Sequence, residues 1–173
     1  MPTREPTSTT NLDIYDDPPL PWSRAHDRLK VDLVEMSTPV FLGTTRPDGR
    51  PHSAGIGALW LDDDLYITSG PGTRKSRNLA ANPFCTLSMR LQGIDLILEG
   101  EAARVTDPET LTNVARAYSE GGWPADVAAD ALTAPYSAPS AGPPPWHVHR
   151  ITVHTAFGVA TTEPYGATRW RFS

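Results

Sequence analysis

The stretch that most constrains the fold runs from Leu65 to Pro83 and reads LYITSGPGTRKSRNLAANP. The residues from Leu65 to Thr68 are of the types that favour a pleated strand. The two glycines and the proline after Ser69 cannot extend a ladder of strand hydrogen bonds, so the chain must turn there. A helix is then expected to begin near Thr73 and to end at Asn82-Pro83, because the position before a proline disfavours helical geometry.

This strand, turn and helix predict a phosphate site. Free backbone N–H groups and the positive end of the helix dipole would converge there with the side chains of Arg74 and Lys75. A solvated basic turn after a strand is the alternative that the spacing leaves open.

The overall composition limits the classes of partner. The net charge is −5, and no basic face stands out from this acidic total, so nucleic acid is not an expected partner. The single Cys85 excludes an internal disulfide, and its apolar neighbours predict a core position. The sequence has no membrane-spanning apolar run and no signal-peptide core, which predicts a cytoplasmic protein.

The length of 173 residues predicts one domain. Residues 1–21 are polar and rich in Pro, Thr and Asp, and we expect them to form a flexible tail before a single domain over 22–173. Apolar residues at the helical period predict an amphipathic helix over 22–36. His26 lies off its apolar face and is expected to be solvated, as is the acidic turn at residues 62–64.

A hairpin should follow, with strands over 39–45 and 51–60 joined by a turn at 46–50 that contains Asp-Gly. The second strand is unusually rich in small residues between Ser53 and Ala58. Something else must approach its backbone, either another protein layer or a flat ligand. His52, at the start of this strand, could donate a hydrogen bond to such a ligand.

The remaining segments extend the same pattern. Strands are expected over 84–90, 94–105, 147–159 and 168–172, with a bulge or bend at Gly100. A capping box at Thr106 and Glu109 predicts a helix that ends at Gly121-Gly122, and residues 123–136 suggest another short helix. A Pro-rich connector spans 137–145. His147 and His149 would share one strand face and His154 the other, so no metal site is expected.

Six or seven strands joined mostly by hairpins, with about three helices between them, predict a mainly β (α+β) protein. The expected architecture is an antiparallel barrel with peripheral helices.

The ordered segments FLGTTRPDGRPHSAGIGALW, LYITS, GTRKSRNLAANPFCTLSM and DLILEGEAARV resemble the pyridoxamine 5′-phosphate oxidase-like superfamily over roughly residues 36–120. The resemblance implies a split β-barrel that binds FMN or coenzyme F420 and acts as an oxidoreductase on a small molecule. The family's phosphate-binding positions fall on Thr73 to Lys75, and its ring-facing glutamine falls near Asp95. Carried over by position, the implied cofactor contacts are His52, Ser53, Ala54, Gly55, Ile56, Gly57, Ala58, Thr68, Ser69, Thr73, Arg74, Lys75 and Asp95.

The chain departs from the true oxidases of this superfamily. Those enzymes carry Arg and Lys on the strand that is small-residue-rich here, and they end in an Arg-x-His-type motif where this chain has Arg169-Trp170-Arg171. Oxidation of pyridoxamine phosphate is therefore not expected. The segment DLILEGEAARV is more similar to the flavin/deazaflavin oxidoreductase group, which favours coenzyme F420 over FMN.

The resemblance also implies a homodimer with cofactor sites between subunits, for which exposed strand edges give a physical motive. Trp123, Trp146 and Trp170 are candidates for pocket walls or for core positions. Two alternatives stay open. One is a non-catalytic carrier of flavin or haem, with His147 or His149 as a haem ligand, and the other is a structural homodimer without a cofactor.

Overall fold

The computed structural model of the protein describes residues 4–34 and 37–173. Nine strands form one antiparallel sheet in the order β1-β11-β10-β7-β6-β2-β3, with β5 also paired to β10 and β4 paired to β5. A separate hairpin joins β8 (Asp126–Ala128) to β9 (Ala131–Thr133). The strands of the large sheet are β1 (Ser8–Asn11), β2 (Val40–Thr45), β3 (Pro51–Ile56), β4 (Ala58–Leu61), β5 (Asp64–Ser69), β6 (Phe84–Leu91), β7 (Ile94–Val105), β10 (His147–Ala160) and β11 (Ala167–Arg171).

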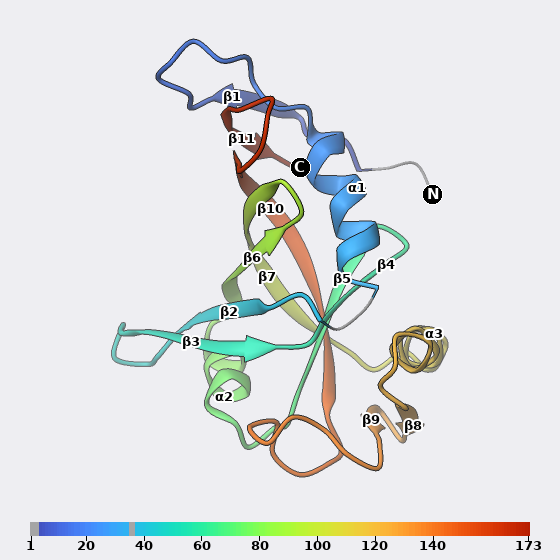
Figure 1. The fold of residues 1–173 in the computed structure, drawn as a ribbon. Coiled ribbons are helices and arrows are strands. Elements are labelled where there is room, and N and C mark those ends of the chain that lie inside the picture. Colours follow the sequence, from blue (N-terminus) through green and yellow to red (C-terminus); the bar gives the residue numbers. More distant parts are fainter. Residues whose placement is uncertain (1–3, 35–36) are drawn as a thin grey trace.

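The long strand β10 organises this sheet (Figure 1). One of its edges pairs with β7 from Val148 to Ala160. Its other edge pairs first with β5, over residues 147–151, and then with β11, over residues 155–159. Within the described part of the chain β3 pairs only with β2, so the barrel stays open between β3 and β5. The prediction of a mainly β, antiparallel split barrel with peripheral helices is thereby confirmed.

The number of strands exceeds the predicted six or seven, and one reason is a break at Gly57. The strand predicted over 51–60 divides there into β3, which pairs with β2, and β4, which pairs with β5. The run of small residues from Ser53 to Ala58 is thus divided between two strands, which pair with different neighbours on the two sides of the barrel opening.

The predicted bulge lies in β10 rather than in β7. The register between these two strands shifts between Val153 and Thr155, which leaves an extra residue on β10. Gly100 faces this point, and a Cβ there would lie 2.2 Å from the carbonyl oxygen of Thr152. The glycine is therefore required for the close approach of the two backbones.

Three helices flank the sheet: α1 (Trp22–Asp32), α2 (Arg74–Ala81) and α3 (Pro108–Glu120). Helix α1 ends before the predicted limit at 36, and residues 35–36 of that prediction lie outside the described residues. Its apolar face joins the main core, where Trp170 is fully buried. The predicted apolar face of α3 is also buried, at Leu111, Val114, Ala115 and Tyr118.

Three local predictions were wrong. His26 is not solvated but 3% exposed, and its Nε2 lies 2.7 Å from Oδ1 of Asp63, which is itself largely buried. The cap of α3 is Asp107 rather than Thr106, because the Asp107 carboxylate accepts a hydrogen bond from the Thr110 N–H. The helix expected over 123–136 is instead the β8–β9 hairpin, which turns through a left-handed Ala129.

Part of the segment predicted to be a flexible tail, residues 8–11, is held in the sheet. Strand β1 pairs along β11 from Ser8 to Asn11, and Leu20 is 2% exposed in the core. A strand at the edge of a sheet pairs through its backbone groups and needs no apolar side chains. The polar composition of residues 8–11 therefore gave no sign of a strand.

Cys85 is buried, and burial raises the pKa of its thiol to about 11, in agreement with the predicted core position. None of the helices in residues 4–34 and 37–173 has the length and apolar character needed to cross a membrane.

Candidate functional site

The start of α2 is fixed to the end of β5 by hydroxyl groups. Thr73 caps the helix: its Oγ1 accepts from the Ser76 N–H and donates to the Gly70 carbonyl at 2.8 Å. The Ser76 hydroxyl donates to Ser69 Oγ at 2.7 Å. These bonds hold the turn and the first helical turn as one unit, so the side chains that follow have defined positions.

Lys75 is the unusual residue of this unit, because it is a cation that is only 6% exposed. It has no carboxylate partner in the part of the chain that the structure describes. Burial lowers the pKa of its ammonium group. A buried cation is normally paired with an anionic group. Because the described residues supply none to Lys75, an anionic ligand is the expected partner.

Lys75 lines a cleft of about 280 Å³ at the open side of the barrel. Here the end of β3 approaches Thr68 of β5, and a Cβ built on Gly55 would meet no atom within 4 Å. The strand surface at Gly55 is thus free for a flat molecule. The remaining walls are Gly121, Gly122 and Trp123 after α3, together with Tyr136, Ser137, Ala138, Ser140 and Ala141.

Helix α3 stabilises the β3–β4 break beside the cleft. The hydroxyl of Tyr118, which is 1% exposed, donates to the carbonyl of Gly57 at 3.3 Å. Burial raises the pKa of this phenol, so the hydroxyl keeps its proton at neutral pH.

The Pro-rich connector forms one wall of the cleft. Trp123 Nε1 donates to the Tyr136 carbonyl at 2.7 Å, and Trp146 Nε1 donates to the Gly142 carbonyl at 3.1 Å. A Cβ on Gly70 would lie 2.4 Å from the Ala141 carbonyl oxygen, so the connector lies directly against the turn before α2. In Figure 1 the connector is the orange loop before β10, near the turn that leads into α2.

His52 lies beside Thr44, which links the hairpin to α2. Its Nδ1 lies 3.5 Å from the Thr44 hydroxyl, which accepts from Asn78 Nδ2 at 3.0 Å. Burial lowers the pKa of His52, and the charges of Arg46, Arg74 and Lys75 lower it further. His52 and Ser53 line a broad depression of about 740 Å³ next to the exposed side chains of Phe41 and Phe84.

The structure brings together part of the predicted site. Five of the predicted residues line the cleft: Gly55, Ile56, Gly57, Thr68 and Lys75. Thr73 and Arg74 belong to the same helix start, and Arg74 is exposed. Ser69 lies in the hydroxyl network, Ala54 is half-buried on β3, and Ala58 is 5% exposed in the core.

Asp95 does not lie in this cleft. It is on β7, where Arg90 of β6 donates to both of its oxygens, at 2.6 and 2.8 Å, and this pairing lowers the pKa of Asp95. It shares a strand face with Ile97, two residues on, which is 44% exposed.

Several cleft residues were missed in the sequence. Gly121 and Gly122 were read only as the end of a helix, and the connector only as a spacer. Nothing in their local pattern signals a role in a site. Of the three tryptophans considered as pocket walls, Trp123 lines the cleft and Trp170 is a core residue. Trp146 packs against Trp123, with 5.5 Å between the two ring centroids.

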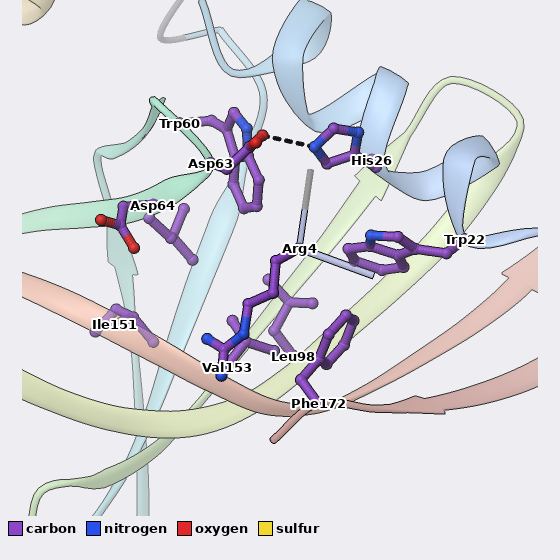
Figure 2. A pocket seen from close by; sticks show the side chains of 11 residues that line it. Arg4, Trp22, His26, Trp60, Asp63, Asp64, Leu98, Ile151, Val153 and Phe172 are labelled. Atoms are coloured by element: carbon purple, nitrogen blue, oxygen red, sulfur yellow. Dashed lines mark hydrogen bonds and ion pairs between the residues drawn. The ribbon is translucent and has the colours of Figure 1, made fainter. Parts of the chain in front are cut away.

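A second hollow lies between α1 and the barrel and contains none of the predicted cofactor contacts (Figure 2). Trp22, His26 and Trp60 surround it together with Asp63 and Phe172. Its volume of about 20 Å³ has room for a water molecule but not for a cofactor. The described residues also contain no group of three His, Cys, Asp or Glu side chains that could hold a metal ion.

A family model described as pyridoxamine 5′-phosphate oxidase matches residues 29–160. The match covers most of the chain, so the chain belongs to this family. A pyridoxine/pyridoxamine 5′-phosphate oxidase from Bacteroides thetaiotaomicron is 34% identical over 80 residues, which are 44% of this chain and 38% of that protein. The match therefore spans little more than a third of the relative's length.

Solved structures give the same fold. An F420 reductase aligns with a TM-score of 0.51 and 22% identity, over 72% of this chain and 93% of its own. A pyridoxamine 5′-phosphate oxidase-related, FMN-binding protein from Nostoc punctiforme aligns with a TM-score of 0.56 and 15% identity, over 86% of this chain and 88% of its own. A conserved hypothetical protein from Mycobacterium tuberculosis aligns with a TM-score of 0.55 and 19% identity, over 90% of this chain and 88% of its own. At these identities the likeness shows the fold alone.

Proposed function

We propose that this chain is an oxidoreductase that uses coenzyme F420 or FMN to transfer hydride to or from a small organic substrate. The observation that carries the proposal is Lys75: a lysine that is 6% exposed, lines the cleft and has no carboxylate partner among the described residues, beside an open glycine-containing strand end. Membership of a family that includes oxidases, and the fold shared with an F420 reductase and an FMN-binding protein, support a flavin-type cofactor.

The residues at the start of α2 fit the phosphate of either cofactor. The Lys75 ammonium and the Arg74 guanidinium would pair with the phosphate, and the helix N–H groups would donate to it. Thr73 is committed to capping the helix, so its hydroxyl holds these groups in position. Each charge-assisted hydrogen bond would contribute about 1.5–3 kcal/mol.

The residues of the β3 end fit a planar ring. Gly55 leaves the strand surface open, and Tyr118 fixes the backbone at Gly57. The bound cofactor would supply the hydride chemistry, while the protein orients the ring and excludes water. Trp123 and the connector residues would form the outer wall, next to which a substrate would lie. No side chain needs to act as a nucleophile.

We further propose that two copies of the chain form the active unit. Large apolar side chains stand exposed on the sheet face, among them Phe41 at 51%, Phe84 at 60% and Ile97 at 44%. Phe41 and Ile97 both pair with Ser88 of β6, so they lie in one row across three strands. A second copy on this face would bury them and would give Asp95, on the same face, access to the partner's cofactor.

The test is a titration of FMN and coenzyme F420 into the purified protein and into the double variant Arg74→Ala/Lys75→Ala. We expect the parent to bind one of the cofactors, and we expect the double variant to bind it at least a hundredfold more weakly, because two charge-assisted contacts are lost. Sedimentation of the same samples should give a particle of two chains.

The matched control is Arg50→Ala/Arg116→Ala, which removes the same charge at two exposed positions away from the cleft. If the Arg74/Lys75 variant binds cofactor as tightly as this control, the phosphate assignment is wrong. A Soret band in the purified protein would favour the haem-carrier alternative. Flavin or deazaflavin absorbance without turnover, when cognate electron donors are supplied, would favour a cofactor carrier.

A further inference from the structure

A second pocket lies against α2 and is lined by residues that the cofactor cleft does not use. Its volume is about 370 Å³, and its polar wall consists of Ser76, Arg77, Arg104, His147 and His149. Three elements meet there, because the two histidines are on β10, Arg104 is on β7 and the first two residues are on α2. The family resemblance assigned none of these residues to an FMN or coenzyme F420 site.

The charges around this pocket have one sign. Two guanidinium groups and two imidazoles line it, and no carboxylate is among its lining residues. Arg104 is partly neutralised, since its Nη2 lies 2.7 Å from Asp130 Oδ2. Arg77 donates to the Gly72 carbonyl and has no carboxylate partner in the described part of the chain. The two guanidinium groups therefore favour an anion at this wall.

His149 provides a second, independent observation, because one of its ring nitrogens lacks a hydrogen-bond partner. Its side chain is 8% exposed, and its Nδ1 is buried without any hydrogen-bond partner. Its backbone pairs with Arg104 on β7 and with Ile67 on β5, so the ring is held on this face of the sheet. Buried polar atoms are rarely left unpaired, and those that are require an explanation.

We propose that this pocket binds an oxyanion, the phosphate or carboxylate group of a small molecule, through His147, His149, Arg77 and Arg104. A bound oxyanion would balance the two guanidinium groups, and rotation of the His149 ring toward it would give the buried Nδ1 a partner. The volume exceeds the space that a single ion needs and lies within the range of small-molecule sites. The proposal does not depend on what occupies the cleft beside Lys75.

The proposal predicts that binding strengthens as the pH falls. Burial, together with the smaller effects of the nearby His147 and Arg104, lowers the pKa of His149 to about 4, so its ring is neutral at pH 7. Burial also lowers the pKa of His147, with Arg104 adding to the effect and Asp130 opposing it. Arg77 faces the same space from α2. An anion favours the protonated imidazoles, so bound anion raises both pKa values.

The experiment follows the imidazole NMR signals of the full chain while inorganic phosphate, and separately citrate, is added. We expect saturable shifts of the His147 and His149 signals and a higher pKa of His149 at saturation. The Arg77→Gln/Arg104→Gln variant should bind at least tenfold more weakly. Arg150→Gln, an exposed change on the other face of β10, should bind as the parent does.

The same titration on Arg74→Ala/Lys75→Ala separates this site from the cofactor cleft, because the shifts at His149 should persist there. The proposal is overturned if neither phosphate nor citrate gives saturable shifts at these histidines. It is equally overturned if the Arg77/Arg104 variant binds as the parent does, or if Zn²⁺ shifts the signals where both oxyanions fail.

Discussion

Two buried basic side chains, His26 on α1 and Lys75 on α2, stand in opposite situations. His26 is 3% exposed and has Asp63 at 2.7 Å, with Trp60 edge-on at 5.8 Å between ring centroids. Lys75 is 6% exposed and has no carboxylate partner among the described residues. Burial of a basic group therefore does not by itself indicate a ligand site. The distinguishing feature is whether the chain supplies the partner, and His149 resembles Lys75 in this respect.

The largest expected effect concerns the unpaired His149. A histidine whose pKa is lowered to about 4 in the folded state takes up protons less readily than in the unfolded chain, where its pKa is near 6.5. Its contribution to stability is thus complete above pH 6.5 and is lost as the pH falls from 6.5 to 4. The expected loss is roughly 3 kcal/mol at pH 4.

Urea unfolding of the parent and of His149→Leu, at several pH values from 7.5 to 4, measures this loss. The difference between the two chains isolates His149 from the other titrating groups, such as His147. Equal pH slopes for both chains would show that this ring is not held neutral by burial.

The next effect concerns the paired His26. Asp63→Ala removes the acceptor and leaves the buried Nε2 without a partner, which should lower the free energy of unfolding by about 2 kcal/mol. Asp63 has a left-handed backbone (φ 65°), which alanine tolerates poorly, and Asp62 shares this conformation (φ 52°). Asp62→Ala is therefore the matched control, and the loss is counted as the excess over it. No excess in a denaturation experiment would mean that the His26–Asp63 contact adds nothing.

The smallest effect on stability has the opposite sign. Lys75→Met removes a buried charge while keeping the length of the side chain, and we expect the cofactor-free protein to gain about 1 kcal/mol. Cofactor affinity should fall by about ten- to a hundredfold, because one charge-assisted contact is lost. Urea unfolding and cofactor titration of the same samples check both results. A loss of stability with unchanged affinity would assign Lys75 a structural role.

The sequence was most informative where local signals agree. The Asp-Gly hairpin, the turn after Ser69 and the Thr73–Asn82 helix limits depend on short-range chemistry, and the structure has them where they were predicted. The proposed anion-binding position follows from the same residues, since the helix cap and the adjacent cations are neighbours in the chain.

The wrong predictions depended on long-range partners. His26 became a buried residue through Asp63, 37 positions away, and β1 became a strand through β11 at the far end of the chain. The connector became a wall of the cleft because Trp123 and Trp146 bind its carbonyl groups. Asp95 lies apart from the other predicted contacts for the same reason, since its place depends on how β7 pairs and not on its neighbours in sequence.

The pairing of β1 with β11 also matters for handling the protein. If the first 21 residues were deleted, β11 would keep β10 on one edge but would lose β1 on the other, along Thr168 to Arg171, and the core would lose Leu20. A naked strand edge is a template for other chains. Variants that lack residues 1–21 should therefore aggregate during expression. Purification tags are better attached ahead of β1 than in place of it.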